Sequence, residues 1–329
     1  MMKLNKPLVS ICCITYNHVN YIRDCIEGFL KQKTLFPVEI IIHDDASTDG
    51  TDRIIREYAD KYPEFIITII QKENQFSKGI KPIFEYVYPR AQGKYIANCE
   101  GDDYWTDSYK LQKQVDFLEK NPDYSMICTK YRKYSQKKQK YLRSNFNRRK
   151  YKKEIKFEDY ILDMSSIATA TVVFDKSILK NFEKGGMTTF VVGDTPLWLY
   201  IAATSKIAVL PEVTSTYRIL NNSACHFSDY NKHYDFVKKG FSIAEYFLHK
   251  YAYDNKELEK GLIIRKLRHD LFYGYRSFNK EIAENAFMEL SKFKLSFKYK
   301  ISSIVYYFGS KTALLHKLTR YLFKLYLVI

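Results

Sequence analysis

The chain has 329 residues with a net charge of +16, and 46% of them are apolar and 16% aromatic. This length and apolar content allow a sizeable core and exclude a chain that is disordered throughout. The sequence contains no run of about 18 apolar residues, so it predicts no transmembrane helix. The apolar run 7–14 is too short for a signal peptide. The six cysteines form no CxxC pair, which favours free thiols in a reducing cytosol; they stand at 12, 13, 25, 99, 128 and 225.

Strand-like and helix-like segments alternate over the first 125 residues. Apolar, β-rich runs predict strands at 8–15, 38–42, 65–70 and 95–99. Apolar residues at helical spacing predict helices at 19–33, 51–62, 79–91 and 108–120. This alternation predicts an α/β fold with a mostly parallel central sheet flanked by helices, whose ligands sit at the carboxyl ends of the strands.

The pattern is mixed after residue 125 and becomes helical after residue 228. We expect strands at 169–174 and 206–210 and helices at 176–182, 197–203, 231–250 and 256–278. The predicted organisation is one domain over 1–228, with a change of pattern at residue 125, and a basic helical extension over 229–329.

Acidic residues gather at two predicted strand ends of this basic chain. Asp44 and Asp45 follow one strand, and Glu100, Asp102 and Asp103 follow another. Carboxylates this close repel one another, so each is harder to ionise. A divalent cation that also binds substrate phosphates removes this penalty. The clusters therefore predict a metal and a phosphorylated ligand.

Three segments carry a family pattern: VSICCITYN over 9–17, VEIIIHDDASTDGT over 38–51, and GKYI through EGDDYW over 93–105. With these segments the chain resembles family 2 glycosyltransferases, which have the GT-A nucleotide-diphospho-sugar-binding fold. Gly193-Asp194 and Tyr217-Arg218 are weaker matches. The resemblance covers residues 8–125 firmly and extends more loosely to 228. It implies a catalytic domain over 1–228, in which 1–125 is the donor-binding half and 126–228, with a basic loop at 130–153, is the acceptor half.

The resemblance implies a donor site at the first two strand ends. Thr15, Tyr16 and Asn17 match the turn that contacts the base or ribose, where a flat surface and fixed hydrogen-bond partners are needed. Asp45 matches the acid that accepts a hydrogen bond from the base, with Asp44 as second choice. The alternative for the turn is a structural one, with Asn17 as a helix cap.

The triplet at 100–102 occupies the place of the family's Asp-x-Asp motif. Asp102 would bind Mg²⁺ or Mn²⁺. Glu100 departs from the usual Asp, and its longer arm would meet ribose or a metal-bound water. Asp103 would steer the sugar or support the metal ligands. The alternative is a solvated acidic turn before the next helix.

The same resemblance implies the catalytic residues of the second half. Asp194 matches the base that takes the acceptor proton, and its alternative role is a helix cap. Arg218 would lie near the diphosphate or the acceptor, or else on the surface. His226 would be a metal ligand, or a surface histidine. A single base and direct attack imply inversion at the anomeric carbon.

The implied function is metal-dependent transfer of a sugar from a nucleoside diphosphate sugar to a hydroxyl of a glycan or lipid-linked acceptor, as in surface polysaccharide synthesis. UDP is the expected carrier, with GDP and dTDP as alternatives.

Two basic segments stand outside this pattern. Residues 130–153 hold twelve Lys and Arg and no acid, which fits a solvated loop, a contact for lipid headgroups, or a nucleic-acid patch. The last alternative gives a rival function, a non-enzymatic nucleic-acid-binding protein, although the acidic strand ends argue against it. The tail 300–329 predicts either a basic amphipathic helix on an anionic membrane or a helix packed on the domain. The expected location is cytoplasmic, peripheral at the inner face of the membrane.

Overall fold

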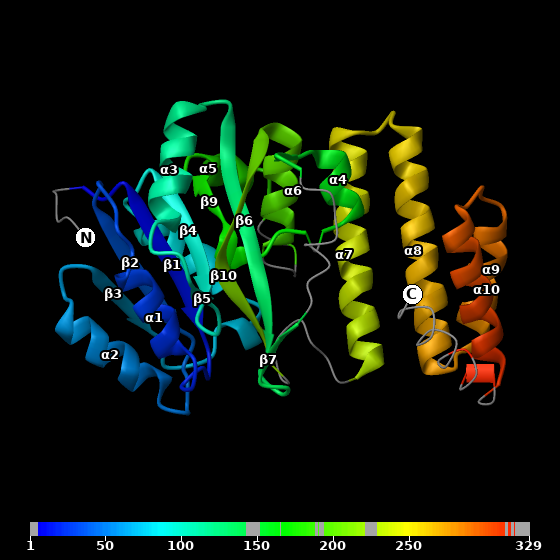
Figure 1. Ribbon diagram of the computed structural model, residues 1–329, viewed down its shortest axis with the longest axis horizontal. Helices are drawn as coiled ribbons and strands as arrows, with labels where there is room; N and C mark the ends of the chain where they lie inside the picture. Colours follow the sequence, from blue (N-terminus) through cyan, green and yellow to red (C-terminus); the bar gives the residue numbers. More distant parts are fainter. Residues whose placement is uncertain are drawn as a thin grey trace. The chain divides into compact units, whose positions relative to one another are not determined.

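A computed structural model of the chain describes residues 6–142, 152–164, 166–187, 190, 194–220, 229–312, 315–316 and 319. The chain forms two compact units, Met1–Asn221 and Asn222–Ile329. The first unit is an α/β layer structure and the second is helical (Figure 1). Each unit is described by itself.

The first unit is built on a 10-stranded sheet with the central order β3-β2-β1-β4-β9-β6-β10-β5. The strands β1, β2, β3 and β4 are mutually parallel, whereas β9 runs antiparallel to both β4 and β6. The mixed α/β fold expected from the sequence is confirmed. The strands are β1 (Val9–Thr15), β2 (Val38–Asp44), β3 (Ile66–Ile70), β4 (Tyr95–Glu100), β5 (Tyr104–Trp105), β6 (Tyr124–Ser135), β7 (Lys140–Leu142), β8 (Glu154–Ile155), β9 (Val173–Asp175) and β10 (Lys206–Ile219).

Alternating strand residues fill two cores, because successive side chains of a strand point to opposite faces. On one face, Ile11 and Ile40 share a cluster with Ile26, Ile55 and Val115. Those three residues belong to α1 (Ile22–Leu30), α2 (Thr51–Lys61) and α3 (Lys110–Lys120). Near-continuous apolar strands are the sequence signature of a sheet covered on both faces.

The other face carries an aromatic core. Phe174 of β9 lies edge-on to Trp198, with ring centroids 5.7 Å apart, and Phe84 stacks on Phe182 at 5.6 Å. Trp198 comes from α6 (Thr195–Thr204) and Phe182 from α5 (Ile178–Lys184). A further short helix, α4 (Phe157–Leu162), was not expected from the sequence.

The helix predicted over 79–91 is confirmed only in part. Residues 83–90 are helical, but they form a π-helical turn, η2 (Ile83–Val87), and a 3-10 turn, η3 (Tyr88–Arg90), in place of an α-helix; a separate 3-10 turn, η1 (Phe76–Lys78), precedes them. Pro82 stands at the N-cap of η2, whereas Pro89, inside the segment, lacks the amide hydrogen that a regular α-helix needs.

Three expectations for the second half need correction. Residues 130–142 are not a loop, because β6 extends to Ser135 and pairs with β7 as a hairpin; residues 143–151 lie outside the described part. The strand expected at 169–174 is a 3-10 turn, η5 (Thr169–Thr171), followed by β9. The strand expected at 206–210 continues as β10 to Ile219, with irregular pairing around Val213.

The second unit contains α7 (Tyr230–Tyr251), α8 (Lys256–Ser277), α9 (Lys280–Ser291) and α10 (Phe297–Lys311). Asp229, Asn255 and Asn279 each accept a hydrogen bond from a backbone N–H in the first turn of the helix that follows. These caps satisfy amides that have no partner inside the helix. Among the described helices, none is long and apolar enough to cross a membrane.

Candidate functional site

The carboxyl ends of β1, β2 and β4 bring the predicted site residues to one edge of the sheet. Thr15 pairs with Asp44 in the register of β1 and β2, and Ile14 pairs with Glu100 in that of β1 and β4. Three segments that are distant in sequence therefore end side by side. Sequence reasoning predicted this edge as the ligand site because the strands are parallel.

The turn after β1 is held against the acidic turn after β4. Thr15 Oγ1 lies 2.9 Å from His18 Nδ1. A Cβ on Gly101 would lie 2.6 Å from the Thr15 Cβ and 3.1 Å from His18 Nδ1, so this close approach requires glycine. Tyr16 is 45% exposed at the same turn, which leaves its ring accessible to a ligand.

Asn17 has a structural contact in addition to its predicted role. Its backbone is left-handed (φ 55°), a conformation that asparagine tolerates better than most residues. Its side-chain oxygen accepts a hydrogen bond from Thr48 N at 2.9 Å, and Ser47 Oγ accepts one from Asn17 N at 2.8 Å. Asn17 thus joins the turns that follow β1 and β2.

Asp44 and Asp45 are both buried, but they face different partners. Asp44 accepts hydrogen bonds from the backbone N–H and the hydroxyl of Ser47, while burial raises the pKa of its carboxyl group. Ala46, between them and Ser47, has a left-handed φ of 65°. This turn directs the two acids into separate environments.

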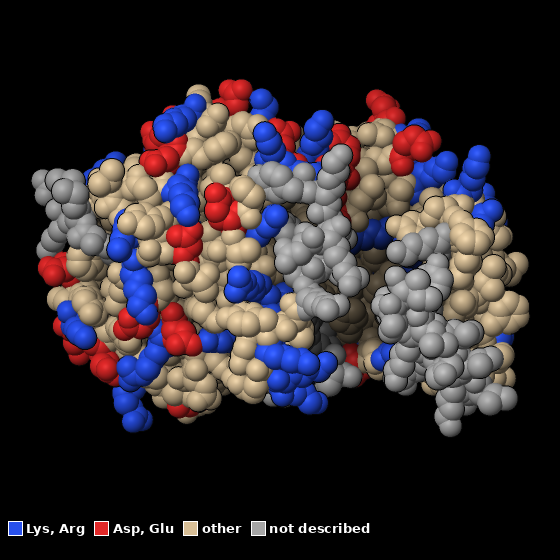
Figure 2. Space-filling model, viewed as in Figure 1, with Lys and Arg blue, Asp and Glu red and all other residues tan. Residues whose placement is uncertain are grey.

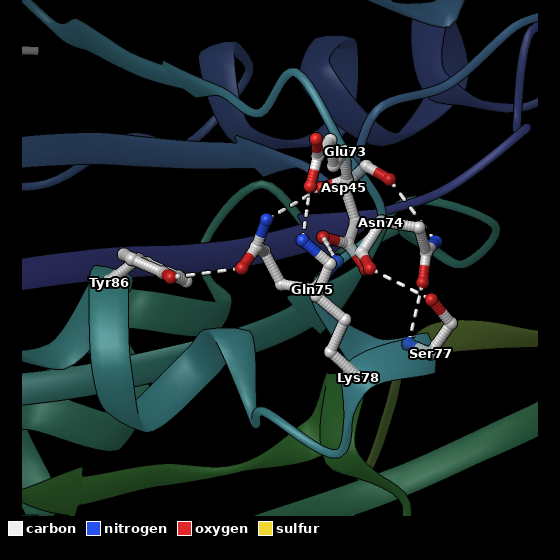
Figure 3. A network of polar contacts seen from close by, with 7 residues as sticks. All are labelled: Asp45, Glu73, Asn74, Gln75, Ser77, Lys78 and Tyr86. Atoms are coloured by element: carbon white, nitrogen blue, oxygen red, sulfur yellow. Dashed lines mark hydrogen bonds and ion pairs between the residues drawn. The ribbon is translucent and has the colours of Figure 1, made fainter.

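Asp45 anchors the loop that follows β3 (Figure 3). Its carboxylate oxygens accept hydrogen bonds from Gln75 N at 2.8 Å and Phe76 N at 3.0 Å. Asn74 Nδ2 donates to the Asp45 carbonyl at 3.2 Å, and Tyr86 donates to the Gln75 side chain at 3.3 Å. The loop thereby reaches the same edge of the sheet, a contact that the sequence did not reveal.

In the acidic turn after β4, burial and neighbouring negative charges raise the pKa values of two carboxyl groups. Burial, followed by the charges of Asp102 and Asp194, raises the pKa of Glu100 to about 8. Burial, followed by the charges of Asp102 and Glu100, raises the pKa of Asp103 well above its usual range. Mutual repulsion in a desolvated cluster is the environment that a bound cation relieves.

Arg218 braces this turn from β10. Asp103 accepts a hydrogen bond from Arg218 N at 2.8 Å, and the guanidinium donates to the Asp102 carbonyl at 3.1 Å. The guanidinium also pairs with Asp24 of α1 and lies over the Tyr104 ring at 4.5 Å. Only 6% of Arg218 is exposed. The sequence placed Arg218 near the site but did not reveal Asp24, because the two are 194 positions apart.

Asp194 stands at the N-cap position of α6, yet its side chain caps no backbone N–H. It instead accepts a hydrogen bond from Thr169 Oγ1 at 2.6 Å. The charge of Asp194 raises the pKa of Glu100, so Asp194 lies close enough to the acidic turn to interact with it electrostatically. His226 lies outside the described residues, as does Gly193.

The residues present fit a hard divalent cation held partly by a substrate. Within the described residues, no group of three or more His, Cys, Asp or Glu side chains is arranged to hold a metal. The half-buried Asp102 carboxylate nonetheless contributes to the raised pKa values of Glu100 and Asp103, and the buried Asp103 Oδ2 has no hydrogen-bond partner in this part of the chain. Mg²⁺ and Mn²⁺ prefer oxygen ligands, and Mg²⁺ commonly takes only one or two protein carboxylates when phosphates complete its shell.

The fold and the acidic sheet edge define a GT-A type of nucleotide-sugar-binding domain. Solved structures support this class: S. aureus TarS 1-349 in complex with UDP-GlcNAc has a TM-score of 0.59 at 15% identity, covering 94% of this chain and 83% of its own. A mannosyltransferase from Pyrobaculum calidifontis, in complex with GDP-Man and Mn²⁺, has a TM-score of 0.56 at 14% identity, covering 93% and 86%.

The profile of glycosyl transferase family 2 matches residues 10–182, and the chain belongs to this family. The Escherichia coli UDP-Glc:alpha-D-GlcNAc-diphosphoundecaprenol beta-1,3-glucosyltransferase WfaP is 30% identical over 210 residues, which is 64% of this chain and 76% of WfaP. Mycobacterial relatives at 49% identity over 120 residues are matched over 34% of their length. The chain therefore spans about a third of those relatives.

Proposed function

We propose that the chain is an inverting, metal-dependent glycosyltransferase that moves a sugar from a UDP-sugar to a hydroxyl of a glycan or lipid-linked acceptor. The observation that carries the proposal is the strand register, which brings Thr15, Asp44 and Glu100 to one edge beside the carboxylate of Asp102. A basic chain gains nothing for folding from repelling carboxylates at one edge. A donor diphosphate with its cation gives them a use.

The donor half of the site would be divided between a base end and a phosphate end. Tyr16 offers an exposed ring to the base, and Asn17, Asp44 and Asp45 offer fixed polar groups near it. UDP is favoured over GDP and dTDP because TarS binds UDP-GlcNAc and WfaP is named for UDP-Glc. The GDP-Man complex of the mannosyltransferase keeps the carrier open to test.

At the phosphate end, Asp102 would hold Mg²⁺ or Mn²⁺ together with the donor phosphates. Bound there, the cation would neutralise charge that grows on the diphosphate as the glycosidic bond breaks. Glu100 and Asp103 would orient the ribose, the sugar or the ligands of the cation, and His226 would be a further ligand. Arg218 holds Asp103 and the Asp102 carbonyl in place by direct contacts.

The chemical step would use Asp194 as the general base. The acceptor oxygen attacks the anomeric carbon, the bond from that carbon to the diphosphate oxygen breaks, and the acceptor proton passes to the Asp194 carboxylate. Thr169 Oγ1 donates to this carboxylate at 2.6 Å and fixes its orientation. Attack opposite the leaving group inverts the anomeric configuration.

The acceptor side rests on relatives and on charge. WfaP is named for a diphosphoundecaprenol-linked acceptor, and a putative teichuronic acid biosynthesis glycosyltransferase, TuaG of Bacillus subtilis, is 39% identical over 113 residues. These names support a role in surface polysaccharide synthesis. A lipid-linked acceptor in turn favours a cytoplasmic protein held peripherally at the inner face of the membrane, with the basic tail as the contact.

The decisive experiment is a hydrolysis and transfer screen with UDP-, GDP- and dTDP-sugars in the presence of Mg²⁺, Mn²⁺ or EDTA. We expect cation-dependent turnover that Asp102→Ala abolishes and Asp60→Asn, an exposed acid on α2, leaves unchanged. Turnover that survives EDTA would refute metal dependence. Tight binding of single-stranded RNA without any turnover would instead support the nucleic-acid alternative for residues 130–153.

A further inference from the structure

Helix α10 (Phe297–Lys311) turns apolar side chains outward. Phe297 is 77% exposed, Ile304 46% and Phe308 52%. Positions 297, 304 and 308 are spaced by seven and four residues, so they form one line along the helix. We call these three residues the outward stripe of α10.

The inward face of α10 is made of small and polar residues. Ser303 and Ser310 are buried, and a Cβ on Gly309 would lie 2.7 Å from Thr319 Oγ1. Aromatic rings with a polar tip complete the contact: Tyr306 packs against Phe272 of α8 with ring centroids 5.2 Å apart, and Tyr307 stacks on a phenylalanine of α9 at 4.3 Å. A helix stabilised only by packing would bury its phenylalanines, whereas α10 leaves both Phe297 and Phe308 exposed.

The sequence of α10 itself is cationic, and Glu284 of α9, an acid that reaches α10, pairs with Lys311. No Asp or Glu occurs after Glu289. Lys300 is exposed and stands three residues after Phe297 and four before Ile304, which puts it on the same side of the helix. On the viewed face, the surface over α9 and α10 is mainly uncharged with scattered basic side chains (Figure 2). An apolar stripe beside lysines is typical of helices that lie in a membrane interface.

We propose that the outward stripe of α10 inserts into the headgroup region of an anionic membrane, with Lys300 beside lipid phosphates. This deepens, and rests on, the proposed peripheral location of the enzyme, because it names the surface that makes the contact. A second copy of the chain is the poorer occupant. A twofold pairing through this face would bring identical lysines together, and like charges oppose such contacts, whereas anionic lipid complements them.

Attachment through one short stripe is reversible. Three partly inserted side chains and a lysine give a weak hydrophobic term and a screened electrostatic term, so binding should weaken as salt is added. Such a contact would let the protein exchange between membrane-bound acceptors and soluble donors.

The test is co-sedimentation of the full chain with vesicles of phosphatidylcholine alone or mixed with phosphatidylglycerol. We compare wild type with the double variant Ile304→Gln, Phe308→Gln, which keeps good helix formers at exposed positions. The double variant should lose at least about tenfold in partitioning to the anionic vesicles. Lys300→Gln should reduce partitioning to the anionic vesicles by a smaller factor, and only at low salt concentration.

The matched control is Leu35→Gln, which removes an 84% exposed leucine from the first unit and should sediment as wild type. Equal sedimentation of wild type and the double variant would overturn the proposal. The proposal would also be overturned if light scattering showed a wild-type dimer that becomes monomeric in the double variant while vesicle binding stays unchanged. Circular dichroism checks folding, and cation-dependent hydrolysis of the soluble donor, unchanged in the variant, separates this proposal from that of the glycosyltransferase site.

Discussion

The acidic edge of the first unit and the outward stripe of α10 in the second break the burial rule in opposite directions. At the acidic edge, Asp103 and Asp44 are carboxylates with almost no exposed surface. On α10, two phenylalanines and an isoleucine are left in solvent. Folding alone favours neither arrangement, since charges belong in water and large apolar side chains belong in the core.

Different ligands would stabilise the buried carboxylates of the acidic edge and the exposed apolar side chains of the outward stripe. The acidic edge is narrow and held by directional contacts from β1, β4 and β10, so a small ion and a phosphorylated ligand suit it. The outward stripe is linear and open, so only an extended apolar and anionic surface suits it. The size and rigidity of a region that breaks the burial rule therefore indicate what kind of ligand it takes.

The largest expected effect comes from the proposed base. Asp194→Asn keeps the shape and the Thr169 contact but cannot accept the acceptor proton, so transfer should fall by about 10³-fold or more. Donor affinity, measured by calorimetry, should stay within about threefold of wild type. Near-normal turnover in the variant would remove Asp194 from the mechanism and weaken the acidic edge as a catalytic region.

The second effect concerns the close approach of the turn after β1 to the acidic turn after β4. Gly101→Ala would force its Cβ to 2.6 Å from the Thr15 Cβ, so the acidic turn must move away from β1. We expect a loss of about 2 kcal/mol in unfolding free energy and a KM for the donor that rises at least about tenfold. Gly79→Ala is the control: its φ of 82° strains the backbone, but a Cβ there meets no atom within 4 Å. Equal donor KM values in the two variants would contradict the steric argument.

A buried lysine at the start of α3 gives a pH-dependent prediction. Lys110 is fully buried over the Trp105 ring at 4.3 Å, and its Nζ finds no hydrogen-bond partner in the described residues. Burial lowers its pKa from 10.5 to about 7, so between these values the unfolded chain binds the extra proton. Its contribution therefore makes stability rise as pH increases from about 7 to 10 and is fully unfavourable below 7.

Lys110→Met removes that contribution. The variant should gain about 3 kcal/mol over wild type at pH 6, and the gain should shrink by pH 9.5. Both tryptophans, Trp105 and Trp198, belong to the first unit, so fluorescence during urea unfolding reports on it alone. If the stability difference between variant and wild type is the same at both pH values, burial does not lower the pKa of Lys110.

The smallest effect tests the turn between the two buried acids. Ala46 has a left-handed φ of 65°, which costs an alanine about 1 kcal/mol or more. Ala46→Gly should stabilise the chain by about 0.5–1 kcal/mol, after the extra entropy loss of glycine is subtracted. Ala59→Gly, inside α2, is the matched control and should destabilise by about 1 kcal/mol. Destabilisation by both substitutions would show that the backbone at Ala46 is not strained.

The fold class, and the edge of the sheet at which the candidate site residues gather, followed from local sequence pattern. Alternating apolar strands and periodic helices imply a parallel sheet, and parallel strands must deliver the residues that follow them to one edge. The spacing of the strands along the chain therefore already grouped Thr15, Asp44 and Glu100. The helix expected at 79–91 formed only as π-helical and 3-10 turns over 83–90, because Pro89 removes a hydrogen bond that a regular α-helix needs.

Only the tertiary structure decided what these residues touch. The contacts of Arg218 with Asp24 and of Asp194 with Thr169 join distant segments, and no local pattern encodes a pair of that kind. The same is true of α10: its composition shows an amphipathic helix, but which face is buried depends on what α8 and α9 present to it. Local periodicity fixes the elements, whereas burial and pairing are properties of the packed whole.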